Sequence, residues 1–257
     1  MNRYVLLLSL LINFSCSPDR SKTETKSDNS ILKYSIRAVL PHDTQAFTEG
    51  LVIHNGKVFE STGSENSWIA EVNVETGIQN KKVHLDKAYF GEGITILNNK
   101  IYQLTWKNNA GFIYDLPTYQ KIGEFSYERE GWGITHNNHQ LIVSDGSAIL
   151  YFLDSVDLTV ARKITVKENN VDATKLNELE FIEGYIFANQ WETKYILKID
   201  PLSGTVVGKL DLSELVNKAK WMYPQADVLN GIAYNERTKD ILVTGKFWPL
   251  SFLIRLN

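Results

Sequence analysis

Carboxyl, amide and amine side chains stand beside small residues in this chain, where a ligand can approach the backbone closely. Glu92 lies between two glycines, Lys246 follows a glycine, and Asn177 lies at the start of an apolar run. A carboxyl group that faces two atoms of a substrate can carry a proton between them, and a fixed donor can stabilise an oxyanion. The same residue types also latch neighbouring turns together, so the pattern alone leaves a structural role open.

The sequence lacks the motifs of several common enzyme classes. It contains no glycine-rich dinucleotide or phosphate loop and no Gly-x-Ser-x-Gly nucleophile. Its single cysteine excludes an internal disulfide, and its histidines do not have the spacing of zinc ligands. The net charge of −3 provides no basic field for nucleic acid. Carboxylates, amides, a lysine and tryptophans therefore remain as the candidates for chemistry.

One short phrase recurs at steps of roughly 40–50 residues, the length of a propeller blade. Each copy runs from a polar residue through a small one to an apolar run, and two further apolar runs follow. The copies are Phe47–Leu51, Phe90–Ile94, Gly131–Ile134, Leu176–Phe181 and Leu229–Ala233. Equivalent positions of a radial repeat lie on one ring, so we expect these polar residues to converge near the axis.

Counting the strands predicts an all-β fold, a five-bladed β-propeller closed by an N-terminal strand in the last blade. The first four units carry a fourth strand, at 81–85, 120–125, 161–166 and 206–210. The fifth unit ends with the chain at Ser251–Leu256, while a spare strand, Tyr34–Leu40, precedes the first. Pairing the two removes an exposed sheet edge. A loop at Lys167–Lys175 and a helical insert at Leu212–Pro224 lengthen two connections.

The first residues have the features of an export signal. Arg3 precedes the apolar run Tyr4–Ile12, which is too short to span a bilayer as a helix. Cys16 follows this run and resembles the lipidation site of a bacterial lipoprotein; an ordinary cleaved signal is the alternative. Residues 17–30 are polar and predict a disordered tether. We therefore expect a signal segment at 1–15, a tether at 16–31 and one propeller domain at 32–257.

Eight motifs occur in one order over the propeller region. They are Ala46–Leu51, Phe90–Thr95, Gln103–Trp106, Gly131–Gly133, Leu176–Glu180, Ala188–Trp191, Leu229–Ala233 and Val243–Pro249. Together they resemble the glutamine cyclotransferase family, the plant and bacterial type of glutaminyl-peptide cyclotransferase. The resemblance runs from about Tyr34 to the end of the chain. It implies a five-bladed propeller that closes an N-terminal glutamine into pyroglutamate with release of ammonia.

The resemblance also implies roles for individual residues. Glu92 would shuttle the proton, Asn177 would orient the substrate carboxamide, and Lys246 would stabilise the oxyanion or lower the pKa of a nearby carboxyl. The aromatic wall around the substrate residue would be formed by Phe47, Phe90, Trp106, Trp132 and Trp191. Core packing is the usual role of such rings, and a lysine among them can instead extend past the rings to solvent.

Glu49 departs from the family pattern, in which many members carry Gln at this place. A carboxylate here would bind the substrate ammonium and raise the pKa of the amine. Repulsion between the two carboxylates would raise the pKa of Glu92 as well. We therefore expect Glu49 to change the rate and the pH optimum rather than the reaction.

The expected partner is a peptide or protein that begins with Gln, and nucleic acid is not expected. No catalytic cofactor or metal is predicted, while a structural divalent cation in the central channel is left open. The chain is expected in the periplasm or at the cell surface, as a monomer that meets the membrane only through a lipid anchor. Two other functions stay open from the residues alone. A non-catalytic propeller would bind a peptide terminus or a partner protein. A calcium-dependent, lactonase-like propeller would use Glu49, Glu92, Asn177 and Asn230 as ligands.

Overall fold

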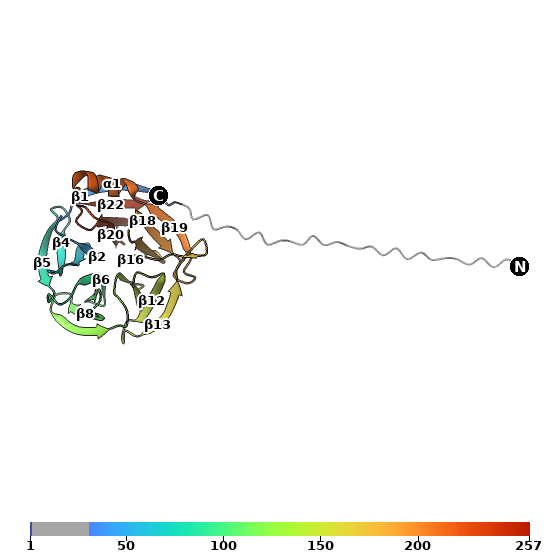
Figure 1. Cartoon of the computed structure of the whole chain (residues 1–257), viewed down its shortest axis with the longest axis horizontal. Coiled ribbons are helices and arrows are strands. Elements are labelled where there is room, and N and C mark those ends of the chain that lie inside the picture. Colours follow the sequence, from blue (N-terminus) through green and yellow to red (C-terminus); the bar gives the residue numbers. More distant parts are fainter. Residues whose placement is uncertain (2–30) are drawn as a thin grey trace.

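The protein is described by a computed structural model that covers Met1 and residues 31–257. Figure 1 shows residues 31–257 as a ring of sheets around one axis. Residues 2–15 of the predicted signal segment, Cys16 and residues 17–30 of the predicted tether lie outside the described residues. In the part of the chain that the structure describes, no helix is long and apolar enough to cross a membrane.

Five antiparallel sheets of four strands each surround the axis, so the predicted five-bladed arrangement is confirmed. The innermost strands are β2 (Thr48–His54), β6 (Gly91–Leu97), β10 (Ile134–His136), β16 (Leu176–Ile182) and β20 (Leu229–Asn235). The second strands are β3 (Lys57–Thr62), β7 (Lys100–Thr105), β11 (Gln140–Ser144), β17 (Tyr185–Gln190) and β21 (Asp240–Gly245). The third strands are β4 (Trp68–Asn73), β8 (Ala110–Asp115), β12 (Ile149–Asp154), β18 (Tyr195–Ile199) and β22 (Leu250–Leu256). The outer strands are β5 (Ile78–His84), β9 (Lys121–Ser126), β13 (Val160–Thr165), β19 (Val206–Asp211) and β1 (Tyr34–Pro41).

The outer strand of the fifth blade comes from the other end of the domain. β1 runs antiparallel to β22, with Tyr34 opposite Leu256 and Leu40 opposite Ser251. A second link joins the fifth blade to the first, because the Phe247 N–H donates to Ala46 O at 2.8 Å. The first and last strands of the described domain therefore lie side by side (Figure 1).

Two connections carry extra structure where the sequence shows longer links. The predicted helical insert contains α1 (Ser213–Met222), whose apolar residues Leu215, Val216 and Ala219 are buried. The predicted loop contains a short hairpin, β14 (Lys167–Glu168) and β15 (Val171–Asp172). The helix packs in the same core cluster as the fifth blade, which contributes Ile232 to it.

Glycines allow the inner strands of neighbouring blades to approach one another closely. A Cβ atom on Gly93 would lie 2.7 Å from Trp132 O, and one on Gly50 would overlap the backbone of Ile94. Larger residues at these places would push the blades apart. Because each of these glycines follows the polar residue of its phrase, the close packing sets that residue at the inner end of its blade.

Candidate active site

The polar residue of four phrases lies at an irregularity of strand pairing. Register shifts between the first and second strands fall at Thr48/Gly50, Gly91/Ile94, Leu176/Leu179 and Leu229/Ile232. The polar residues within them are Glu49, Glu92, Asn177 and Asn230, all at most 5% exposed. A bulge turns a side chain away from the regular alternation of a strand. The bulges thus gather polar groups at one end of the propeller; in the third blade, Trp132 has the equivalent place.

Lys246 meets Glu49 at this end of the propeller. It follows β21, whose last residue, Gly245, is paired with Leu229 at the start of β20. Lys246 Nζ lies 2.6 Å from Glu49 Oε1, and the two side chains are only 7% and 2% exposed. Asn230 Nδ2 donates to the other carboxylate oxygen, Oε2, at 3.3 Å. The carboxylate is therefore held on both oxygens.

The Glu92 carboxyl group adjoins this pair, and its surroundings favour the protonated form. Burial, followed by the charge of Glu49, holds the pKa of Glu92 well above its ordinary value. Burial also raises the pKa of Glu49, to about 7, although the charge of Lys246 opposes that rise. A hydrogen bond between the two carboxyl groups lowers the pKa of Glu49 and raises that of Glu92. The site thus contains two carboxyl groups with raised pKa values and a fixed cation.

Asparagine side chains at this end keep atoms without a partner. Within residues 31–257, Asn177 Oδ1, Asn230 Oδ1 and Asn189 Nδ2 are buried and have no hydrogen-bond partner. An unpaired polar atom of this kind costs about 1–3 kcal/mol, unless a ligand or water meets it. Asn230 is anchored through its other end, because Nδ2 also donates to Thr48 O at 2.9 Å. Acceptors fixed in this way suit the N–H groups of an amine or a carboxamide.

Glu178 ties three blades together beside the site. It stands where the other four phrases have glycine, and its Oε2 accepts the Ile232 N–H at 2.8 Å. Its Oε1 accepts the Leu51 N–H at 3.3 Å. Burial and then the charge of Glu180 raise the pKa of Glu178 well above its usual value. Glu178 thus lies in β16 and accepts hydrogen bonds from β20 and β2. This role explains the residue, which the sequence analysis did not single out.

Aromatic rings form an arc at the same end. Phe47 contacts Phe247 and Phe90 at centroid distances of 5.1 and 6.1 Å, and Phe90 contacts Trp106 at 5.6 Å. Beyond Trp106, Trp132 meets Trp191 edge to face at 5.5 Å. All these rings are half-buried. The five aromatic residues of the predicted wall thus lie in one arc, to which the structure adds Phe247.

Glu130 joins the two parts of the arc, and the sequence reading missed it. Its Oε2 accepts the indole N–H of Trp106 at 2.8 Å and that of Trp132 at 3.0 Å. Glu130 immediately precedes Gly131, where a copy of the recurring phrase begins. This position could have marked Glu130 as a candidate site residue. Asn230 was foreseen only as a calcium ligand, although it occupies the same phrase position as Glu92.

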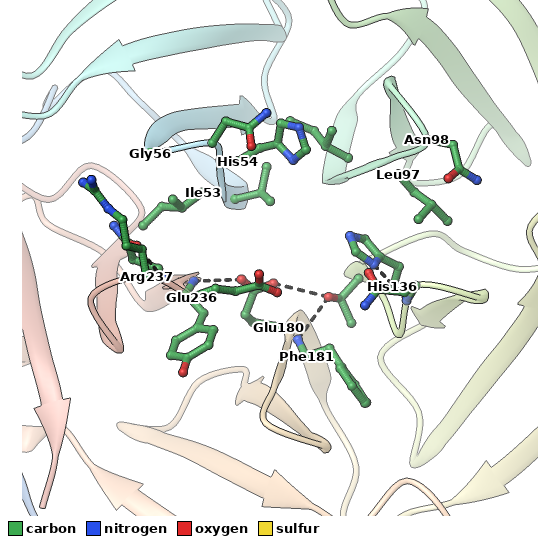
Figure 2. Close-up of a pocket in the computed structure, with 17 residues that line it drawn as sticks. Ile53, His54, Gly56, Leu97, Asn98, His136, Glu180, Phe181, Glu236 and Arg237 are labelled. Carbon is green, nitrogen blue, oxygen red and sulfur yellow. Dashed lines mark hydrogen bonds between the residues drawn. The ribbon is translucent and has the colours of Figure 1, made fainter.

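A cavity of about 900 Å³ opens at the opposite end of the inner strands (Figure 2). His54, His136, Glu180, Glu236 and Arg237 are among the residues that line it, and no residue of the predicted site does. His54 follows Glu49 by five positions, which is about 16 Å along a strand. Burial raises the pKa of Glu180 to about 8, and its Oε1 accepts the Tyr234 N–H at 2.8 Å.

The chemistry favours the end with Glu49 and Glu92 over this cavity. There a buried ion pair adjoins a second buried carboxyl group, unpaired amide oxygens and an arc of rings. In the cavity, by contrast, both oxygens of Glu180 already have protein donors, from Tyr234 and Thr135. Over residues 31–257, no three His, Cys, Asp or Glu side chains group closely enough to hold a metal ion.

Comparisons with known proteins agree on one family. A sequence profile described as "Glutamine cyclotransferase" matches residues 6–256. A curated glutaminyl-peptide cyclotransferase of Arabidopsis thaliana is 37% identical over 231 residues, which cover 88% of this chain and 72% of the plant protein.

Solved structures give the same relationship. The crystal structure of Myxococcus xanthus glutaminyl cyclase matches with a TM-score of 0.82 and 36% identity, over 87% of this chain and 96% of the other. A Bacteroides caccae protein of unknown function matches with a TM-score of 0.50 and 14% identity, over 64% of this chain and 66% of its own. The second match is informative for the fold alone.

Proposed function

We propose that Glu92 and Lys246, beside Glu49, carry the reaction of this chain, which belongs to the glutamine cyclotransferase family and is an enzyme that converts N-terminal glutamine to pyroglutamate. The single observation that supports this assignment is the buried Glu49–Lys246 ion pair next to Glu92, a carboxyl group whose pKa burial raises. The function expected from the sequence is thus confirmed. The residue roles below are proposals.

The reaction adds a proton to the leaving nitrogen and removes a proton from the attacking amine. The α-amine attacks the γ-carboxamide carbon, the new C–N bond forms, and the old one breaks as ammonia leaves. We propose that Glu92 relays the proton: its O–H donates to the leaving nitrogen while its other oxygen accepts a proton from the attacking amine. No net proton is gained or lost, and such help accounts for about 10²–10⁴-fold in rate.

The amine must first be neutral, because an ammonium has no lone pair for attack. The α-amino group titrates near ~7.7–8.0, close to the pKa of about 7 that burial gives Glu49. Glu49 is therefore matched to accept the extra proton of the substrate ammonium. The amide oxygens of Asn177 and Asn230, unpaired in the described structure, are the proposed acceptors that orient the substrate's N–H groups.

Lys246 supplies the positive charge for the oxyanion of the tetrahedral intermediate. One of its N–H groups is bound by Glu49 Oε1 at 2.6 Å, so the others remain to donate to a substrate oxygen. Its Nζ lies 4.3 Å from the centroid of Phe47, which adds a cation–π contact that fixes its position. Because this fixed cation serves the oxyanion, we propose that catalysis uses no metal.

The experiment is incubation of the purified protein with a peptide that begins with Gln. We expect release of ammonia and a matching loss of mass, with no product from the same peptide carrying N-terminal Asn, whose ring would have a different size. A metal chelator should leave the rate unchanged; loss of activity that zinc restores would overturn the metal-free mechanism. Tight peptide binding without turnover would instead establish the non-catalytic alternative.

Two wider proposals accompany the function. We propose that pairing of β1 with β22 closes the ring and is needed for stability; the pairing along Tyr34–Pro41, interrupted only by a shift between Ile36 and Ala38, supports it. We also propose a monomer that is exported to the periplasm or cell surface and lipidated at Cys16. Its support is the signal-like pattern of residues 1–15. Metabolic labelling with a fatty acid, lost in Cys16→Ser, tests the lipidation.

A further inference from the structure

A single carboxylate oxygen holds two tryptophans from neighbouring blades. Trp106 follows the second strand of the second blade, and Trp132 precedes the inner strand of the third. Both indole N–H groups point at Glu130 Oε2, at 2.8 and 3.0 Å. A hydrogen bond to a charged acceptor is about twice as strong as a neutral one. One anionic oxygen therefore fixes the orientation of both rings.

Each indole also contacts another ring of the arc. Trp106 packs against Phe90, and Trp132 packs against Trp191. Between Trp106 and Trp132 no ring contact is found in the described residues, and Glu130 fills this position. Removing the carboxylate would free two indoles at once and open the arc at its middle.

We infer that Glu130 is a positioning residue for the substrate glutamine: it holds Trp106 and Trp132 as two fixed walls of the binding site. The inference rests on the proposed function for its kinetic consequences. Its geometry is independent of that function, because the two hydrogen bonds exist without a substrate. Glu130 also adds negative charge near Glu92, where it contributes to the raised pKa of that acid.

Fixed rings lower the entropy that the protein loses when the substrate binds. Loose rings must be ordered on binding. Loss of their fixed orientation therefore raises KM more than it slows the chemical step, which is assigned to Glu92. The inference thus predicts a split between KM and kcat. A residue with a merely structural role would change the melting temperature and leave this split absent.

Three variants of the full chain separate these effects. Glu130→Leu removes the shared acceptor of the two indoles while keeping a similar size, and Glu130→Gln keeps a carbonyl acceptor for the indoles but removes the charge. Glu128→Leu is the matched control, because Glu128 is an exposed carboxylate two residues earlier in the same loop. Ammonia release from a Gln-initiated peptide gives KM and kcat, and near-ultraviolet circular dichroism reports the fixed tryptophans.

We expect Glu130→Leu to raise KM about ten- to a hundredfold while kcat changes less than about fivefold. Glu130→Gln should recover most of that loss in KM, and Glu128→Leu should resemble the wild type. The near-ultraviolet signal should weaken in Glu130→Leu alone. An unchanged KM and spectrum in Glu130→Leu would overturn the inference. So would a loss in Glu130→Gln as large as that in Glu130→Leu with an unchanged near-ultraviolet spectrum, since the charge would then act without the rings.

A double-mutant cycle tests whether Glu130 acts through the indoles. Replacing both Trp106 and Trp132 by Phe keeps two rings but removes both N–H donors. In that background Glu130→Leu should raise KM less than about threefold. A full additional loss there would overturn the inference. If the wild type releases no ammonia, the proposed function fails, while the spectra of the same variants still decide whether the carboxylate fixes the rings.

Discussion

Lys246 Nζ lies 2.6 Å from Glu49 Oε1, although 197 positions separate the two residues in the sequence. The contact joins the last blade to the first at the inner end of the ring. It also explains the tolerance of a glutamate where many family members have Gln, since the extra charge has a buried partner. Breaking such a pair on one side costs about 3–5 kcal/mol, because the remaining charge is buried and unpaired.

Glu49→Gln should retain activity and move the pH profile to lower pH. The charge of Glu49 contributes to the raised pKa of Glu92, so its removal lowers that pKa. Because the reaction uses the protonated form of Glu92, the alkaline limb then falls at a lower pH. The contribution of Glu49 to the acid limb, at about pH 7, should disappear, which leaves that limb to the substrate amine. The measurement is kcat/KM against pH for both proteins with one substrate. Superimposable profiles would show that Glu49 does not influence the reacting groups.

Glu180→Gln should reduce the loss of stability that accompanies a rise in pH. Burial raises the pKa of Glu180 to about 8 in the folded chain, whereas the unfolded carboxyl titrates near ~4.3. Between these values the folded state holds the extra proton, so its stability is fully present below ~4.3 and falls as the pH rises to about 8. Glutamine does not titrate and removes this contribution, which is at most about 1.4 kcal/mol per pH unit.

The comparison of the two proteins removes the contributions of the neighbouring histidines, so the difference reports Glu180 together with its effect on the pKa of Glu178. His54 and His136 line the same cavity, and burial lowers the pKa of each, which gives stability the opposite pH dependence. They are present in both proteins and cancel. Urea midpoints at pH 5.5, 7 and 8.5 supply the measurement; equal slopes against pH would contradict the assignment of a raised pKa to Glu180.

Removal of β1 should destabilise the whole domain. A variant that begins at Pro41 lacks the strand that pairs with β22, so the last blade would expose an edge and the spare hydrogen-bonding groups of β22. We expect aggregation or a fall in melting temperature of more than about 10 °C. A variant that lacks only residues 17–30 is the control and should melt like the mature chain. Equal melting of all three would contradict closure through β1.

The sequence predicted the blades because each phrase acts locally. A polar residue, a glycine and an apolar run repeat at a fixed interval, and the close approach of Gly50 and Gly93 to the next blade explains why the glycine is needed. Glu92 and Lys246 could be named for the same reason, since each lies in a motif. The predicted helical insert likewise agrees with α1, whose buried face follows a helical period.

The roles of Glu130 and Glu178 depend on distances between blades, which no local pattern contains. Glu130 matters because Trp106 and Trp132 come within reach of one oxygen. Glu178 replaces a glycine of the phrase, and this exception could have been noticed. Its hydrogen bonds to Leu51 and Ile232, however, follow only from the closure of the ring. Contacts around the axis therefore had to come from the structure.

Glu92→Gln should abolish most turnover while the fold stays intact. Glutamine keeps the size and the hydrogen-bonding shape of the side chain, and the neutral form of Glu92 is already the one that the buried site favours. Stability should therefore change little, in contrast to the usual effect of removing a buried charge. A carboxamide cannot relay a proton between the two nitrogens, so the barrier should rise by about 3–5 kcal/mol, or roughly 10²–10⁴-fold in kcat.

The aromatic arc is untouched in this variant, so KM should stay within about threefold of the wild type. Initial rates of ammonia release over a range of substrate concentrations give both constants, with far-ultraviolet circular dichroism as the control for folding. If Glu92→Gln turns over within about threefold of the wild type, Glu92 is not the proton relay, and Glu49 becomes the next carboxyl to test.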